Sequence, residues 1–201
     1  MNSFLDTLQL STGYLNTVSD ANLGQSVQPD GLWGFGGLLG KIWQIPGEQA
    51  LKYSDTTVSS LSGGFYQYVK ANTALVKGDI VCWTATGMET YLVTHTNSAP
   101  LEGLIAGVAL GTVAINNYCF IQTGFGGLAW VNYRASVTDK TAGNLVLQLT
   151  TTATVDAIAD ATGTYISGGV KGLKNIIGTA YDTPTDAGFK RIFLRVPFNF
   201  G

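Results

Sequence analysis

Hydrophobic and polar positions alternate in short runs along the chain from about residue 66 onward. The run 144–149 shows the pattern clearly, because Leu145, Leu147 and Leu149 fall on one side of a strand and Val146 and Gln148 fall on the other. Gly, Asn and Thr separate such runs, as they do in turns between strands. The pattern predicts strands over residues 65–69, 79–85, 90–95, 104–110, 118–123, 128–134, 144–149, 175–181 and 191–198.

Short strands punctuated by turn residues are typical of small all-β folds. We therefore expect an all-β protein, with a small β-barrel or sandwich of short antiparallel strands over residues 71–201 and an extended N-terminal arm over residues 1–70. A chain of 201 residues is long enough for one ordinary domain with its own core and an extension.

The arm differs from the rest of the chain, since it lacks sustained alternation and contains a segment, Gly31 to Pro46, rich in glycine and large apolar side chains. So much apolar area needs a surface to cover it. We predict that the segment docks on a neighbouring subunit through Trp33, Phe35, Leu38, Leu39, Ile42, Trp43 and Ile45. Folding back of the same residues onto the chain's own barrel explains the apolar content equally well.

Charge is scarce, because 12% of the residues are charged against about 25% in an ordinary soluble domain. The 26 glycines, together with many Thr, Ser and Asn residues, suit turns and the outer faces of strands. The net charge of -2 is uneven, with three aspartates and no cation in the first 40 residues and a cluster of cations near the end, Lys171, Lys174, Lys190, Arg191 and Arg195. Neither end is dense enough in charge to indicate nucleic acid, and no apolar run is long enough to span a bilayer.

The two cysteines, Cys82 and Cys119, lie inside apolar runs, so we expect buried thiols in preference to a disulfide. No basic region of a secretory signal opens the sequence, whose first positive charge is Lys41, and no Asn-X-Ser/Thr site occurs. We therefore expect a protein that is made and kept in a cytoplasm.

The sequence contains no motif that is typical of a catalytic site. The single histidine, His95, has no acid near it in sequence, which favours a polar strand or loop residue. The segment from Gly124 fits a dinucleotide-binding spacing, but a strand pattern follows where a helix is needed, so Gly124 to Gly127 predicts a hairpin turn. Asp156 and Asp160 lack the spacing of a calcium loop and are expected to be loop acids. We expect no enzyme activity, catalytic residue, cofactor or bound metal.

Four short motifs occur in a fixed order between residues 76 and 181. A Gly-Asp enters a strand, a Gly-Val-Ala strand follows, a turn leads into a strand that ends in Gly, and an Ile-Gly-x-Ala strand comes late. The residues that carry them are Val76–Trp83, Gly107–Leu110, Tyr118–Gly124 and Asn175–Tyr181. This order resembles the capsid decoration, or cement, proteins of tailed phages. The turn before the third motif has Asn116 and Asn117 where similar proteins often have Gly, and Asn also adopts positive φ.

The resemblance implies a small β-barrel that binds the outer lattice of a phage head, often as a homotrimer, and stabilises it. Its partners would be the major capsid protein and other copies of the chain, and its location would be the capsid surface, after assembly in the host cytoplasm. The first 70 residues carry none of the resemblance.

Two other functions fit the same sequence. One is a tail, collar or head-fibre component, which would share the low charge and the β content. The other is a carbohydrate-binding β-sandwich that stacks sugar rings on Trp83, Trp130, Tyr91 and Tyr133. Aromatic residues that alternate inside strands are more often part of the core.

Overall fold

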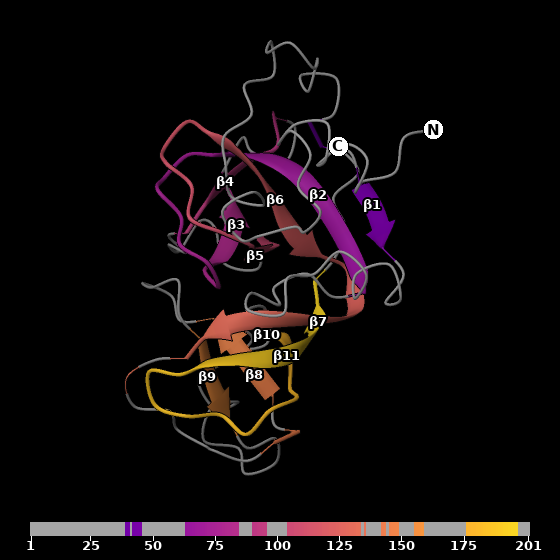
Figure 1. Ribbon diagram of the computed structural model, residues 1–201, viewed down its shortest axis with the longest axis vertical. Coiled ribbons are helices and arrows are strands. Elements are labelled where there is room, and N and C mark those ends of the chain that lie inside the picture. Colours follow the sequence, from indigo (N-terminus) through magenta and orange to yellow (C-terminus); the bar gives the residue numbers. More distant parts are fainter. Residues whose placement is uncertain are drawn as a thin grey trace, which may run out of the picture.

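The computed structural model describes residues 39–40, 42–45, 63–84, 90–95, 104–133, 135, 142–143, 145–148, 155–158 and 176–196. The elements within these ranges are β-strands, which form two sheets (Figure 1). The all-β fold expected from the sequence is therefore confirmed. Most of the arm expected over residues 1–70 lies outside the described residues.

The first sheet is a closed five-stranded barrel. It contains β2 (Gly64–Ala71), β3 (Ile80–Trp83), β4 (Leu92–Thr94), β5 (Ile105–Ala109) and β6 (Tyr118–Thr123) in the order β2-β4-β3-β5-β6, and the pairing of β2 with β6 closes it. The pairs are antiparallel except for β2 and β4, which run parallel over two residue pairs, Lys70↔Leu92 and Ala71↔Val93. Because the sheet closes on itself, each of these five strands pairs with a neighbour on both sides.

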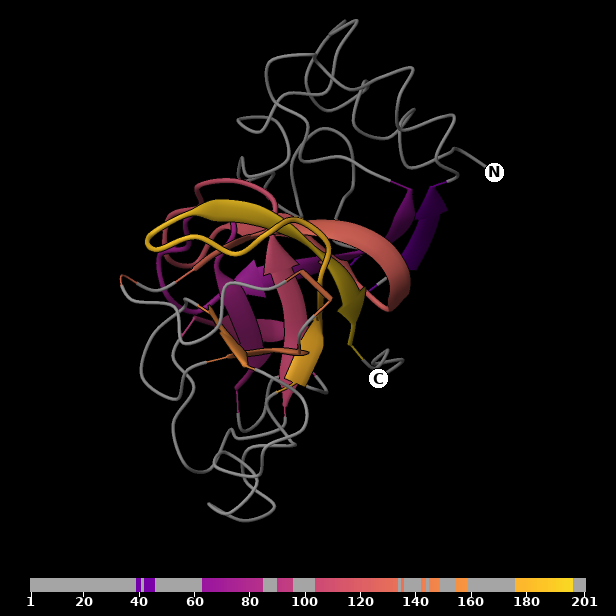
Figure 2. The ribbon, with the colours of Figure 1, turned by 90° about the horizontal axis from the view of Figure 1, so that it is seen from below.

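One further strand, β1 (Ile42–Ile45), extends the first sheet at the margin of the barrel (Figures 1 and 2). It pairs antiparallel with the first half of β2, from Ile42↔Gln67 to Ile45↔Gly64. The sequence pattern did not predict this strand.

The second sheet is antiparallel throughout and lies beside the barrel (Figure 1). Its order is β7-β11-β10-β8-β9, from β7 (Phe125–Asn132), β8 (Leu145–Gln148), β9 (Val155–Ile158), β10 (Ile176–Ala180) and β11 (Phe189–Arg195). Asp156 lies on β9, so its assignment to a loop was wrong, while Asp160 lies outside the described residues.

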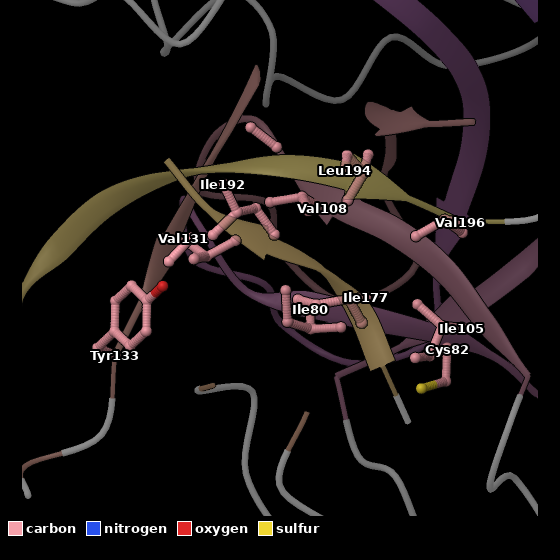
Figure 3. Packing of buried hydrophobic residues seen from close by; sticks show 12 residues of the cluster. Ile80, Cys82, Ile105, Val108, Val131, Tyr133, Ile177, Ile192, Leu194 and Val196 are labelled. Carbon is pink, nitrogen blue, oxygen red and sulfur yellow. The ribbon is translucent and has the colours of Figure 1, made fainter. Parts of the chain in front are cut away.

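Two apolar clusters form the core. The first fills the barrel and includes Val69, Leu75, Val81, Trp83, Ala106, Cys119 and Ile121. The second lies between the barrel and the second sheet, where the outward side chains of β3 and β5 meet those of β7, β10 and β11 (Figure 3); its members include Ile80, Cys82, Ile105, Val108, Val131, Ile177, Ile192 and Leu194. Strands β3 and β5 are thus buried on both faces, which explains their almost continuous apolar sequence.

The chain passes from one sheet to the other at Gly124. Strand β6 ends at Thr123 and β7 begins at Phe125, yet the two strands belong to different sheets, so the predicted hairpin turn over Gly124 to Gly127 was wrong. Gly124 has φ +77, a conformation that glycine adopts without strain, and its carbonyl accepts a hydrogen bond from Val196 N at 2.9 Å. A single residue therefore makes the bend.

A tight turn of the barrel, Val76–Asp79, also joins the two sheets. The carbonyl of Lys77 accepts a hydrogen bond from Asn132 Nδ2 at 2.8 Å, and the carbonyl of Gly78 accepts one from Asn132 N at 3.3 Å. Asp79 closes the turn, since its Oδ2 accepts from Val76 N at 2.7 Å. The shared core and this turn make the barrel and the second sheet one packed body.

Cys82 and Cys119 are buried free thiols, as expected, and burial raises the pKa of Cys119 to about 12. Asn116 has φ +67, which confirms that it takes the positive φ that glycine would otherwise supply in this turn.

Candidate docking surfaces

The segment predicted to dock on a neighbour lies only partly within the described residues. Trp33, Phe35 and Leu38 lie outside them; Leu39 lies in a half-buried turn, and Ile42, Trp43 and Ile45 belong to β1. The structure therefore adds Ile42–Ile45 to the chain's own barrel. Docking of the arm on a neighbouring subunit stays a prediction.

Gly40 anchors this segment just before β1. Its N–H donates to the carbonyl of Tyr68 at 2.8 Å, and its carbonyl accepts from Gln67 Nε2 at 2.9 Å. The ring of Tyr91 lies directly against Gly40, where a Cβ atom would collide with it. Gly40 also has φ +79, so both the contact and the backbone conformation favour glycine.

The outer face of the second sheet carries a different feature, a row of aromatic and cationic side chains. Leu194 and Ile192 of β11 face the core, so the residues that alternate with them, such as Arg191 and Phe193, face outward. The row is made of Lys77, Phe189, Trp130, Arg191, Tyr181 and Phe193, and we call it the aromatic–cation row.

Neighbours within the row are in contact along its whole length. Lys77 Nζ lies 5.0 Å from the centre of the Phe189 ring, which stacks on Trp130 at 5.0 Å and 17°. The guanidinium of Arg191 lies 5.6 Å from the centre of Trp130 and 4.8 Å from that of Tyr181. Tyr181 then meets Phe193 edge to face, with ring centres 5.0 Å apart. Cation–π and aromatic pairs of this kind stabilise the arrangement of the side chains.

Asp182 fixes the central arginine of the row. Its two carboxylate oxygens accept hydrogen bonds from Arg191 Nε at 2.9 Å and Nη2 at 2.8 Å, and Oδ2 also accepts from Arg191 N at 3.0 Å. Such a planar, two-point ion pair sets the orientation of the guanidinium. The hydrogen bonds from Arg191 hold the pKa of Asp182 below its ordinary value.

The row is exposed at one end. Tyr181 retains 44% of its accessible surface and Phe193 retains 40%, and Phe125, across from Arg195 on the same sheet, retains 55%. Interfaces between proteins are enriched in aromatic residues and arginine. The exposed residues of the row are thus of the types that proteins use to contact one another.

A second group of aromatic residues lies on the outer side of the barrel but has a different character. Tyr68 stacks with Tyr118 at 6.0 Å and meets Phe120 at 4.8 Å. Tyr68 and Phe120 are buried, and burial raises the pKa of Tyr68 above its usual range. This group is part of the packing of the molecule.

The four aromatic residues considered as sugar platforms do not form one surface. Trp83 and Tyr133 are buried, and Tyr91 lies against Gly40 and meets Trp83 edge to face. Trp130 lies on the outer face of the second sheet, but Phe189 and Arg191 already contact its ring. Stacking of a sugar requires an open aromatic face, which this set does not supply in one place.

The residues with catalytic potential have structural contacts. At the end of β4, His95 Nδ1 lies 2.9 Å from the carbonyl oxygen of Ala74. Asp79 accepts the hydrogen bond from Val76 N that closes the turn Val76–Asp79. Among the residues that the structure describes, no group of three or more His, Cys, Asp or Glu side chains could hold a metal ion. A search of the same residues for a helix long and apolar enough to cross a membrane found none.

Part of the row can be recognised in the sequence. Phe189, Arg191, Phe193 and Arg195 alternate with Lys190, Ile192 and Leu194, which marks one face of a strand as aromatic and cationic. The remaining members, Lys77, Trp130 and Tyr181, come from other segments, so only the strand pairing brings them to this face.

Comparison with known proteins gave little. No protein-family model matches the chain, and no curated protein matches it. Among solved structures, the N-terminal base of the head fibre protein gp8.5 of bacteriophage phi29 is similar to 64% of this chain and 92% of its own chain, with a TM-score of 0.41 and 11% identity. A likeness of this size carries no argument about what the chain does.

Proposed function

We propose that this protein is a structural component of a tailed-phage virion, and that it decorates the capsid by binding the major capsid protein. The proposal rests chiefly on the four motifs, Val76–Trp83, Gly107–Leu110, Tyr118–Gly124 and Asn175–Tyr181, whose order resembles that in decoration proteins. In this role the protein would stabilise a particle by adding contacts, and it would turn over no substrate.

The motifs that resemble decoration proteins support the proposal through their place in the fold. The first three lie in the barrel, since Val76–Trp83 contains the tight turn and β3, Gly107–Leu110 lies in β5 and at its end, and Tyr118–Gly124 contains β6 and the bend. The fourth, Asn175–Tyr181, contains β10 of the second sheet. The resemblance thus extends over both sheets.

A head-fibre, collar or tail component is the second candidate. The same two-sheet fold would fit such a position, where it would contact a different neighbour in the particle. The two roles differ in number and place, because a decoration protein covers the capsid lattice in many copies and a fibre or collar protein occupies a few defined positions.

The test is to find the protein in the particle. We expect mass spectrometry of purified virions of the phage that encodes this chain to detect it, and cryo-electron microscopy to show it on the outer capsid lattice. Density at a fibre, collar or tail would replace decoration by the second candidate. Absence of the protein from purified virions would contradict both.

A binding measurement complements the localisation. Purified protein is mixed with capsids that lack it and is then co-sedimented with them. We expect saturable binding by the natural protein and weaker binding by Phe125→Ala, which removes an aromatic side chain that is 55% exposed and lies outside the row. The matched control is Ile115→Ala, which removes a side chain that is 57% exposed and lies outside the row.

A further inference from the structure

The aromatic–cation row is pre-organised for binding. Asp182 fixes Arg191, Arg191 contacts both Trp130 and Tyr181, and Tyr181 positions Phe193. Side chains that are already ordered lose little conformational entropy when a partner arrives, so more of the contact energy appears as affinity. The row therefore offers a rigid surface to a partner.

The charge of this face indicates what the partner carries. Lys77 and Arg191 belong to the row, and Arg195 follows Phe193 on the outer face of β11 and is exposed. Lys77, Arg191 and Arg195 against Asp182 and Asp186, the two carboxylates of the loop between β10 and β11, give a local formal charge of +1, on a chain whose net charge is -2. An acidic partner with apolar side chains would complement the face.

The chain itself contains such a partner. Residues 1–38 include Asp6, Asp20 and Asp30 and no lysine or arginine, so their side chains sum to a charge of -3. They also contain large apolar side chains, among them Phe4, Leu5, Trp33 and Phe35. This N-terminal segment matches the face in charge and in apolar character.

The direction of β1 favours a segment from another copy. The Ile45 end of β1 pairs with Gly64, which lies against Gly127 of the second sheet, whereas the Ile42 end pairs with Gln67, farther along β2. Gly40 is fixed beyond that end. Followed toward the N-terminus, the chain therefore runs along the barrel and away from the second sheet (Figure 1).

The segment is also long enough to reach a neighbour. Thirty-eight residues span up to roughly 125 Å when extended, which exceeds the diameter of a small domain several times. Length thus permits the contact, and the fixed position of Gly40 sets the point from which the segment starts.

We propose that the aromatic–cation row binds the acidic N-terminal segment, residues 1–38, of a neighbouring copy of the chain. The contact is head to tail, because each copy gives its segment to one neighbour and receives a segment on its row from another. It holds for the free protein and does not depend on where in a virion the protein is placed. It is therefore tested separately from the proposed function.

The test uses two full-length variants, each defective in one half of the contact. The row variant carries Tyr181→Ala and Phe193→Ala, and the segment variant carries Asp6→Asn, Asp20→Asn and Asp30→Asn. Sedimentation velocity over a concentration series is expected to show self-association of the natural protein, weakened by added salt. Each variant alone is expected to associate at least about tenfold more weakly.

Mixing the two variants is the decisive step. The row variant still has an intact segment and the segment variant still has an intact row, so the mixture is expected to form a complex that neither forms alone. Ile115→Ala, at a side chain that is 57% exposed outside the row, is the control and is expected to associate like the natural protein. Circular dichroism checks that each variant is folded.

Three results would overturn the proposal. A natural protein that stays monomeric at every concentration would show that the segment binds its own chain or that the row binds another partner. A segment variant that associates like the natural protein would point to contacts between two rows. A mixture that stays as weakly associated as its components would exclude the head-to-tail arrangement.

Discussion

At the scale of single residues, two aspartates in turns experience opposite surroundings. Asp182 accepts hydrogen bonds from Arg191, which favour the charged carboxylate and lower its pKa from the ordinary value of 3.8. Asp79 is largely buried, and loss of hydration raises its pKa from the same value despite the hydrogen bond from Val76 N. The two carboxylates therefore make contributions to stability that depend on pH with opposite signs.

Replacement of Asp182 should lower stability at neutral pH. The folded pKa of Asp182 lies below the unfolded one, so its contribution is present above the unfolded value and is lost as the pH falls through the folded value. We expect Asp182→Asn to destabilise the protein by roughly 0.5 to 1 kcal/mol at pH 7, because the pair is partly exposed. Thermal unfolding at pH 7 and at decreasing pH below 3.8 checks this.

The variant Arg191→Lys is the companion measurement. Lysine keeps the charge but cannot make the two parallel hydrogen bonds to the carboxylate, so we expect an effect between those of the natural protein and Asp182→Asn. A difference between Asp182→Asn and the natural protein that stays constant down to strongly acidic pH would contradict the electrostatic explanation.

Replacement of Asp79 should have little cost at neutral pH. An asparagine at this position still accepts a hydrogen bond from Val76 N but carries no charge to be desolvated. We expect Asp79→Asn to unfold at the same temperature as the natural protein or higher at pH 7, within about 1 kcal/mol. As the pH falls toward the raised folded pKa of Asp79, the stability of the natural protein should increase relative to that of the variant.

A strong loss of stability in Asp79→Asn at pH 7 would be the contrary result. It would mean that the ionised carboxylate itself is needed, for example through its attraction to His95. Thermal melts of both proteins across the same pH series measure the sign directly.

At the scale of elements, the turn Val76–Asp79 supports both sheets and the aromatic–cation row. Gly78 has φ +82, and a Cβ atom there would lie 2.5 Å from Phe189, the residue that stacks on Trp130. The Phe189 ring can therefore occupy its place in the row only because residue 78 has no side chain.

We predict that Gly78→Ala destabilises the protein by about 2 to 4 kcal/mol, the sum of backbone strain and displacement of Phe189. Gly143→Ala is the matched control, because Gly143 has a similar φ of +86 and a Cβ atom there would meet nothing within 4 Å. The control should show the backbone cost of about 1 kcal/mol without the collision. Equal losses in denaturant unfolding of the two variants would show that Phe189 is not displaced.

The strands also show what a sequence pattern can reveal. The range 118–123 was predicted correctly, and the strands around residues 65–69, 79–85, 104–110 and 175–181 appear within a few residues of their expected ends. Ile42–Ile45 and Val155–Ile158 were missed, because neither Ile-Trp-Gln-Ile nor Val-Asp-Ala-Ile alternates throughout or is apolar throughout.

The pairing of the strands could not be predicted from the local sequence pattern. Alternation tells which side chains share a face, but closure of the barrel depends on β2 meeting β6, and the row depends on β7, β10 and β11 lying side by side. The prediction of a hairpin at Gly124 was wrong for this reason, because the two strands that this glycine joins belong to different sheets. The predicted docking residues other than Leu39, Ile42, Trp43 and Ile45 lie outside the described residues.

At the scale of the whole molecule, the two sheets share one apolar cluster. Ile80 and Val108 of the barrel pack in the same cluster as Ile177 and Ile192 of the second sheet (Figure 3). Because each sheet covers apolar side chains of the other, neither should remain folded after the other has unfolded.

We predict that Ile177→Ala, on β10, lowers the free energy of unfolding by about 2 to 5 kcal/mol and weakens the barrel as well as the second sheet. Hydrogen exchange should show faster exchange in β3 and β5 as well as in β10 and β11. Loss of protection confined to the second sheet would contradict a shared core. Ile115→Ala, at an exposed position, should change neither sheet.

Closure of the barrel by β2 and β6 also has a consequence for the order of folding during synthesis. The two strands are separated by roughly 50 residues, so the ring of strands cannot close before Thr123 has emerged from the ribosome. The outward side chains of β3 and β5 then stay uncovered until β10 and β11 have been translated. The nascent chain therefore reaches its stable fold only after β11 has emerged.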